Sequence, residues 1–262
     1  MLDALIMFGG SFTFVLLLMA VLWVIYLFQH NAAIIDIGWG LSFLITAWVY
    51  FFLGDGDLFK RLLLTAMVTV WAGRLTTHLF LRYVPEKEDP RYTRLREKWG
   101  GDPSGALFLM LFIFQGVLVV ILSLPFFLVD WGSTSEWSKW EFIGIAVWLV
   151  GVLGEAAADK QLANFMKDPE NRNKVCNQGL WRISRHPNYF FEWMVWIGFF
   201  LFALPSYGGG FAILSPAIIL LLLTKVSGIP LAEEEALASK GATYREYQRT
   251  TSAFIPWFSK GP

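Results

Sequence analysis

The amino-acid sequence predicts an all-α, multi-pass integral membrane protein, a bundle of seven transmembrane helices with the N-terminus outside and the C-terminus in the cytosol. Three observations predict this fold: the apolar composition, the long apolar stretches, and the placement of Lys and Arg along the chain. The 262 residues are 56% hydrophobic and include 24 Phe and 13 Trp. One water-soluble domain of this size has too little interior to hold so many large apolar side chains.

Seven apolar stretches are long enough to be transmembrane helices, which need about 20 mostly apolar residues. They cover residues 4–28, 33–53, 59–81, 105–129, 139–157, 187–205 and 211–228. The first is not expected to be a cleavable signal peptide, because it has no basic flank and its apolar run is too long. A single membrane domain over residues 1–262 is the simplest organisation.

The orientation follows from the positions of the 21 Lys and Arg residues. Six fall in residues 82–104, six in residues 158–187 and five from residue 225 onward. Cytoplasmic loops carry an excess of Lys and Arg, so these three segments are expected in the cytosol. The surrounding membrane is expected to be a bacterial plasma (inner) membrane, because the sequence carries no targeting signal.

Five ionisable residues interrupt the predicted spans. A charge at the centre of a membrane helix costs roughly 2.5–3.5 kcal/mol, so such residues usually mark a function. They are Asp36, Arg74, Glu155, Glu192 and Lys225. Because all five fall near the same membrane face, they predict a polar chamber open to the cytosol.

Polar residues also occur four positions apart near the cytosolic ends of three spans. Two residues at this spacing project from one helix face, so each pair can face the bundle interior together. The pairs are Arg74 with His78, Glu155 with Asp159, and Asn188 with Glu192. The alternative is that these groups only pair with one another, for instance Arg74 with Glu155, and hold the helices together.

Residues 185–189, Arg-His-Pro-Asn-Tyr, are a predicted loop-to-helix junction with Pro187 at the first helical position. The N–H groups of a first helical turn attract anions, so this helix start beside Arg182 and Arg185 is a candidate phosphate or carboxylate site. Alternatively, both arginines contact lipid headgroups. Residues 233–246 are charged and compatible with a helix, which would either cover the chamber as a lid or remain solvated.

Several classes of site have no support in the sequence. No G-x-G-x-x-G or phosphate-loop motif is present, and no nucleophile elbow occurs. With three His and one Cys and no metal-ligand spacing, no metal site is expected. The basic loops are explained by membrane topology, so no nucleic acid partner is expected. Cys176 stands alone, which excludes an internal disulfide.

Several motifs in the second half of the chain resemble the C-terminal domain of the steroid 5α-reductase family. They are Glu155 with Asp159, Asn-Gln-Gly-Leu-Trp at 177–181, Ser-Arg-His-Pro-Asn-Tyr-Phe at 184–190, Glu192, Tyr-Arg-Glu-Tyr at 244–247 and Phe-Ile-Pro-Trp at 254–257. The whole chain resembles the bacterial branch of that family, labelled DUF1295. The superfamily also includes the more distant isoprenylcysteine carboxyl methyltransferases, which share the Arg-His-Pro-x-Tyr junction.

The resemblance implies a bound NADPH among the cytosolic ends of the later helices. Residues 1–130 would then supply the substrate-side helices and residues 139–262 the cofactor-binding region. The cofactor-binding residues implied by position are Arg74, Arg91 or Arg94, Glu155, Asp159, Lys174, Asn188, Glu192 and Glu234, and the helix start adds Arg185.

In the steroid enzymes a glutamate on the second span and a tyrosine on the third polarise the substrate carbonyl. The resemblance places Asp36 and Trp71 at these positions. A Trp has no phenolic proton to release, so Asp36, His78 or a water would have to protonate the substrate. Asp36 can donate a proton only in its neutral form.

These observations lead to an expected function and two alternatives. The expected function is NADPH-dependent reduction of a carbonyl-conjugated C=C bond in a lipophilic, steroid- or isoprenoid-like compound, in contact with membrane lipid. The second is methyl transfer from S-adenosylmethionine to a lipid-like acceptor. The third, outside the enzymes, is a membrane scaffold or carrier. Substrate identity, the choice between NADPH and NADH, and the oligomeric state are left open.

Overall fold

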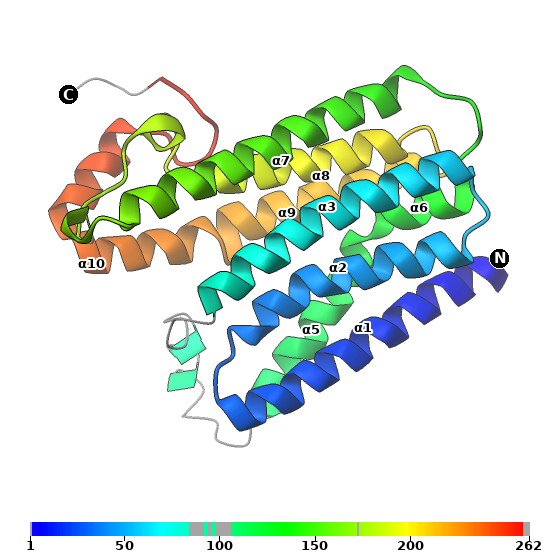
Figure 1. Cartoon of the computed structure of the whole chain (residues 1–262), viewed down its shortest axis with the longest axis horizontal. Helices are drawn as coiled ribbons and strands as arrows, with labels where there is room; N and C mark the ends of the chain where they lie inside the picture. Colours follow the sequence, from blue (N-terminus) through cyan, green and yellow to red (C-terminus); the bar gives the residue numbers. More distant parts are fainter. Residues whose placement is uncertain (1, 84–91, 94–95, 98–105, 172, 259–262) are drawn as a thin grey trace. The chain divides into compact units, whose positions relative to one another are not determined.

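The computed structural model describes residues 2–83, 92–93, 96–97, 106–171 and 173–258 (Figure 1). Every regular element in this part of the chain is helical, and no strand occurs in it. The predicted all-α fold is therefore confirmed. The chain divides into two compact units, Met1–Trp137 with Ala203–Ala212 and Ser138–Phe202 with Ile213–Pro262. They are called the N-terminal unit and the C-terminal unit below.

Several helices are long and apolar enough to cross a membrane. In the described residues four qualify singly, Leu2–Gln29, Ile34–Leu53, Lys139–Met166 and the continuous run Gly209–Thr250. A fifth arises if the bent pair Phe108–Leu122 and Leu124–Gly132 is one span. The length and composition of these helices are consistent with the predicted membrane protein. The other two predicted spans are also helical, but one carries several charges and the other has only 17 residues.

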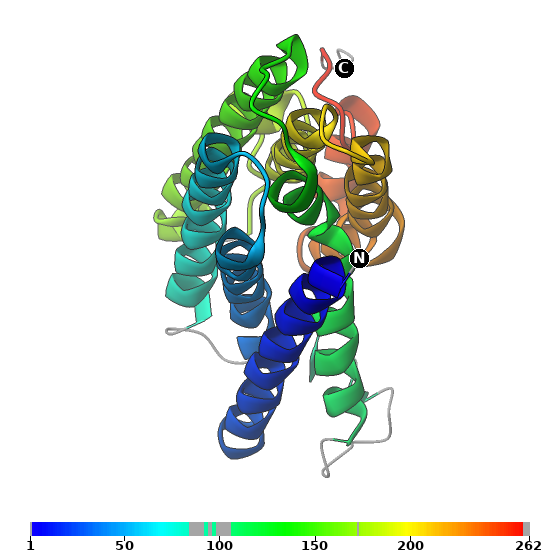
Figure 2. The same cartoon turned by 90° about the vertical axis from the view of Figure 1, so that its right-hand side faces the viewer.

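In the N-terminal unit, α2 (Ile34–Leu53) is the central helix. It contacts α1 (Leu2–Gln29), α3 (Leu58–Tyr83), α5 (Ala106–Leu122) and α6 (Leu124–Gly132), and α1 also packs on α5 (Figure 2). The absence of a side chain at Gly40 lets α2 approach Thr76 of α3, and Gly38 makes room for Leu22 of α1. Small residues at helix interfaces allow such close packing.

Buried hydroxyl groups join these helices in the interior of the unit. Ser11 of α1 donates to Thr46 of α2 at 3.2 Å, and the hydroxyls of Tyr50 and Ser123 lie 3.2 Å apart. Hydrogen bonds between Ser, Thr and Tyr side chains satisfy polar groups that water cannot reach. These contacts therefore hold α1, α2 and the α5–α6 junction together.

The predicted span at 105–129 is bent between α5 and α6, by 43°. The bend lies at Ser123, whose hydroxyl donates to the carbonyl of Val120 at 2.8 Å. Pro125 occupies the first turn of α6. Proline is tolerated there because the first N–H groups of a helix have no intrahelical acceptor. The proline accordingly begins a new helix and does not interrupt an existing one.

An ion pair ties α3 to α6 near the α2–α3 turn. Arg61 Nε lies 3.4 Å from Asp130 Oδ1, and the side chains are only 13% and 1% exposed. The turn itself is closed by the N–H of Gly56, which donates to the carbonyl of Asp130 at 2.8 Å. A Cβ on Gly54 or Gly56 would collide with the backbone of α6. The two glycines therefore permit the close approach that buries the ion pair.

In the C-terminal unit, α7 (Lys139–Met166) and α8 (Pro187–Ala203) pack through glycines. A Cβ on Gly144 would lie 2.6 Å from the N of Phe202, and one on Gly151 would lie 2.8 Å from the N of Val195. A Cβ on Gly198 of α8 would likewise meet Trp148 of α7. Each step forward along α7 is matched by a step back along α8, so the two helices are antiparallel neighbours.

The remaining elements complete the C-terminal unit (Figure 1). They are η1 (Pro169–Asn171), η2 (Gly179–Arg182), α9 (Leu214–Leu221), the π-helical turn η4 (Leu222–Val226) and α10 (Ile229–Thr250), while η3 (Gly209–Ile213) spans the division between the units. Pro187 begins α8 as predicted, and the charged stretch 233–246 is helical as predicted. Gly241 has a positive φ of 54° and bends α10.

Candidate functional site

The cytosolic end predicted for the later helices contains a cluster of polar side chains on α7 and α8. The amide of Asn188 donates to Asp159 Oδ1 at 3.3 Å. One turn deeper, Glu155 is 5% exposed, and Glu192 accepts a 2.9 Å hydrogen bond from the indole of the fully buried Trp196. The two predicted pairs at helical spacing thus occupy the same stretch of this helix pair.

The glycine contacts explain this arrangement. A Cβ on Gly154 would overlap the ring of Phe191, and Gly151 already faces Val195 one turn away. Continuing this antiparallel register by one more turn sets Asp159 opposite Asn188, where their hydrogen bond is found. Backbone packing at glycine therefore aligns residues that are far apart in the sequence.

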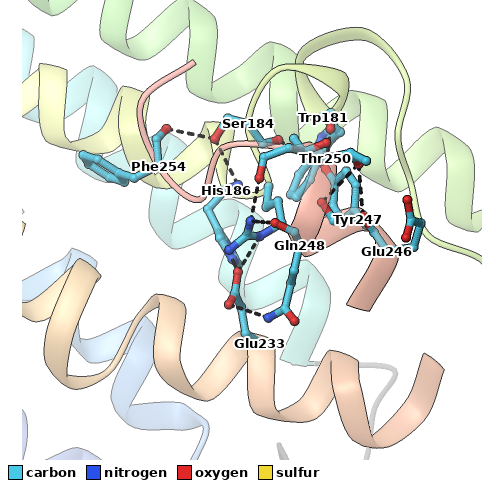
Figure 3. A network of polar contacts seen from close by, with 11 residues as sticks. Trp181, Ser184, His186, Glu233, Glu246, Tyr247, Gln248, Thr250 and Phe254 are labelled. Carbon is cyan, nitrogen blue, oxygen red and sulfur yellow. Dashed lines mark hydrogen bonds and ion pairs between the residues drawn. The ribbon is translucent and has the colours of Figure 1, made fainter. Parts of the chain in front are cut away.

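A second polar network lies at the start of α8 and is centred on Glu233 of α10 (Figure 3). Arg185 Nε donates to Glu233 Oε1 at 2.7 Å, and His186 Nε2 lies 3.3 Å from the same oxygen. The amide of Gln248 donates to Glu233 Oε2 at 2.8 Å. The bend at Gly241 makes this last contact possible, because it turns the end of α10 back toward Glu233.

The electrostatics of Glu233 follow from these contacts. This residue lies on α10, which carries seven charged side chains and lies beyond the apolar part of the 209–250 run. Burial alone would raise the pKa of Glu233, but hydrogen bonds with His186, Arg185 and Gln248 lower that pKa to about 2. The carboxylate is accordingly ionised at neutral pH and balances the guanidinium of Arg185.

Arg185, predicted to bind the cofactor, has structural partners in this network. Besides Glu233, its Nη1 donates to the carbonyls of Gln248, at 2.9 Å, and Thr251. Its backbone N–H donates to the carbonyl of Ser252 at 2.8 Å. The guanidinium therefore ties the start of α8 to α10 and to the chain that follows it.

Tyr247 holds the same region from the other side. Its hydroxyl donates to the carbonyl of Trp181 and, at 3.3 Å, to that of Ser184. The Trp181 indole donates to the carbonyl of Ala158 on α7 at 3.0 Å. Cys176 is buried nearby, and burial raises the pKa of its thiol. A buried thiol with a raised pKa is a poor nucleophile.

The N-terminal unit contains a carboxylate and a phenol in direct contact. Tyr92 Oη donates a 2.7 Å hydrogen bond to Asp36 Oδ1, and Tyr92 is 8% exposed. Asp36 lies in the first turn of α2, which begins after Asn31 accepts the N–H of Ala33. Sequence reasoning missed Tyr92, because it lies in the basic segment 82–104, where no helical or strand periodicity singles it out.

The other predicted residues of the N-terminal unit lie on α3. Trp71 is fully buried, and its ring packs 5.4 Å from that of Phe43. Arg74 and His78 are half-buried on the same helix. Arg91 and Arg94 fall outside the described residues.

The two remaining predicted cofactor residues are on the surface of the C-terminal unit. Lys174 is exposed in the turn after η1, and Glu234 is exposed on α10 beside Glu233. Among the described residues, no group of three or more His, Cys, Asp or Glu side chains is placed to hold a metal ion.

The helical fold and the long apolar helices, with polar clusters between them, are consistent with an α-helical membrane protein. The chain belongs to the family described as "Protein of unknown function (DUF1295)", whose family model matches residues 22–251. The predicted DUF1295 membership is therefore confirmed.

Two relatives come from Schizosaccharomyces pombe (strain 972 / ATCC 24843). The chain is 26% identical over 272 residues to "Uncharacterized protein C594.04c", covering 90% of this chain and 76% of that protein. It is 36% identical over 80 residues to "Uncharacterized protein C9.08c", covering 25% of this chain and 28% of that protein. No solved structure matches the chain.

Proposed function

We propose that this protein is a membrane-embedded, NADPH-dependent reductase of a carbonyl-conjugated C=C bond in a lipophilic, steroid- or isoprenoid-like substrate. The observation that carries the proposal is the 2.7 Å hydrogen bond from Tyr92 to Asp36. The steroid 5α-reductases, which the sequence resembles, polarise the substrate carbonyl with a carboxyl group and a phenol. The sequence has Trp71 at the position expected for the phenol, and Tyr92 supplies the missing phenolic group.

The pair performs its role as follows. Reduction at the far alkene carbon leaves negative charge on the carbonyl oxygen, which a preorganised hydrogen-bond donor stabilises. A neutral Asp36 donates from its outer oxygen, while the Tyr92 hydroxyl holds the other oxygen and favours the carboxylate that forms. An ionised Asp36 has no proton to donate. It would only accept the hydrogen bond from Tyr92, and the substrate carbonyl would then have no donor.

The polar cluster of the C-terminal unit suits the nucleoside part of a dinucleotide. Carboxylates such as Glu155 and Asp159 accept hydrogen bonds from ribose hydroxyls, and the Asn188 amide can pair with a carboxamide. The phosphates need cations, for which the family resemblance, and not the described geometry, gives Lys174, Arg74, Arg91 and Arg94 as candidates. The bound NADPH would supply the hydride. Arg185 is assigned to folding, given its contacts with Glu233 and backbone carbonyls.

We also propose that α3 and α8 cross the membrane, which gives seven transmembrane spans. The N-terminus then lies outside, and the active site faces the cytosol of a bacterial plasma membrane. The charges of α3 support this because Arg74 and His78 share a face that a bundle interior can accommodate. The assignment of the short helix α8 as a span is supported by its close glycine contacts with the apolar part of α7.

A thermal-shift measurement on detergent-purified protein tests the cofactor. NADPH, NADH and S-adenosylmethionine are compared in parallel, because a ligand at 100 times its dissociation constant stabilises a protein by about 2.7 kcal/mol. We expect stabilisation by NADPH. Stabilisation by S-adenosylmethionine alone would contradict the reductase and favour the methyltransferase, and no response to any of the three would favour a scaffold or carrier.

A further inference from the structure

The segment Phe254–Phe258, called the aromatic tail here, exposes large apolar side chains. Ile255, Trp257 and Phe258 are 58%, 68% and 86% exposed. Three such residues within four positions form an apolar surface that water solvates poorly. A segment of this composition in contact with water would be expected to fold inward or to lose order.

The backbone of the aromatic tail is nevertheless held in place. Ser184 Oγ donates to the carbonyl of Phe254 at 2.8 Å, and the N–H of Trp257 donates to the carbonyl of Ile183 at 2.9 Å (Figure 3 labels Ser184 and Phe254). These bonds fix the main chain on one side and leave the side chains of Ile255, Trp257 and Phe258 on the outside. The fold thus presents the apolar side chains and does not hide them.

The ring of Phe254 shows at what depth along the helices the aromatic tail lies. It packs 5.7 Å from the ring of Phe190 and 5.8 Å from that of Trp193, both in the first two turns of α8. Through its glycine contacts α8 runs beside the apolar part of α7, a candidate membrane span. The Asp159–Asn188 contact lies where that apolar part ends. The aromatic tail therefore lies at the depth where the apolar, membrane-spanning part of α7 ends and polar residues begin.

We propose that the aromatic tail inserts Ile255, Trp257 and Phe258 into the headgroup–acyl boundary of the lipid bilayer and anchors the C-terminal unit there. Trp is enriched at this boundary because its ring is apolar and its N–H can remain hydrated. Arg182, which is exposed and precedes Ile183 in the chain, supplies a positive charge suited to anionic headgroups. The inference does not depend on the reductase activity.

Spin labelling in nanodiscs tests this proposal. Cys176 is the only cysteine and is buried, so a Cys176→Ala background allows one nitroxide at a time. Labels are placed by Trp257→Cys, Phe258→Cys and Ile255→Cys in nanodiscs of phosphatidylcholine with phosphatidylglycerol. Collision with oxygen, which concentrates in lipid, is compared with collision with a water-soluble nickel chelate.

Two further positions in the same unit calibrate the measurement. Leu149→Cys on α7 is the lipid reference, because Leu149 is exposed within the apolar part of a candidate span. Ser239→Cys is the water reference, because Ser239 is exposed on the charged helix α10. Size-exclusion chromatography selects the folded fraction of each variant, and the three tail labels are independent replacements.

We expect the ratio of oxygen to nickel collisions at the tail positions to be several-fold above that at Ser239 and below that at Leu149. A ratio equal to that at Ser239 would show the tail in water and overturn the proposal. Protection from both reagents would also overturn it, because the tail would then be covered by another protein surface. Removing the anionic lipid should lower the ratio if Arg182 contributes.

Discussion

The hydroxyl of Tyr92 donates to the carboxyl group of Asp36 at 2.7 Å and so joins two residues 56 positions apart. One belongs to the first turn of α2 and the other to a basic segment that topology alone would explain. A phenol that donates to one oxygen of a carboxyl group fixes the orientation of that group and leaves its second oxygen available. The proposed carbonyl-polarising pair depends on this contact.

Tyr92→Phe should reduce turnover and leave cofactor binding intact. Tyr92 positions Asp36, the proposed proton donor, through the 2.7 Å hydrogen bond, and a positioned acid typically contributes about 100-fold or more in rate. No cofactor contact is assigned to Tyr92. NADPH consumption with a panel of lipophilic enones measures the first quantity, and the NADPH-dependent thermal shift measures the second. Tyr207→Phe is the matched control, since Tyr207 is 74% exposed in the same unit. Unchanged turnover in Tyr92→Phe would remove the pair from the mechanism.

The stability of the protein should fall as the pH is lowered from about 4.5 to about 2. The pKa of Glu233 is lowered in the folded state from 4.5 to about 2, so its contribution to stability is present above the unfolded value. That contribution is lost as protons bind to the folded carboxylate. Thermal unfolding in detergent as a function of pH measures the effect.

Glu233→Gln should remove most of that pH dependence and lower the unfolding temperature at pH 7. Glu246→Gln is the control, because Glu246 is 54% exposed and pairs only at the surface with Arg249. If Glu233→Gln kept the wild-type slope below pH 4.5, the network of Arg185 and Glu233 would not be the source of the pH dependence.

Gly151→Ala should destabilise the pairing of α7 with α8. The new Cβ would lie 2.8 Å from the backbone N of Val195, so the helices would have to separate. Overpacking typically costs about 1–3 kcal/mol. Gly9→Ala on α1 is the matched control, because a Cβ there meets nothing within 4 Å. We expect a lower unfolding temperature for Gly151→Ala alone. Equal unfolding temperatures for the two variants would contradict the close packing of α7 against α8 at Gly151.

Arg61→Ala should be strongly destabilising. Removing one partner of a buried ion pair typically costs about 3–5 kcal/mol, because the remaining group must stay buried as an unpaired charge or be neutralised by a proton. The remaining Asp130 is 1% exposed and cannot be solvated without local unfolding. The double variant Arg61→Met with Asp130→Leu should recover much of the loss, as measured by thermal unfolding. If the double variant were as unstable as Arg61→Ala, the loss of stability would come from altered packing at this site and not from an unpaired charge.

Much of the fold can be predicted from the chain without coordinates. Long apolar runs can bury their backbone only as helices within a membrane, which is why the helical class and the approximate helix ranges are confirmed. Pro187 marks the start of α8 because its fixed φ and missing N–H suit a first turn. Spacing of four residues placed Glu155 with Asp159, and Asn188 with Glu192, on common helix faces.

Pattern alone did not predict the partners across helices. Asp159 meets Asn188 because glycines on α7 and α8 align the helices, and that alignment depends on three-dimensional packing. Arg185 was predicted to bind an anion, and in the structure its partners are Glu233 and the backbone carbonyls of Gln248 and Thr251, which lie after the bend at Gly241. Local composition determined that the chain is helical and membrane-like. Only the tertiary structure decided which charges meet, because that depends on contacts between residues distant in the sequence.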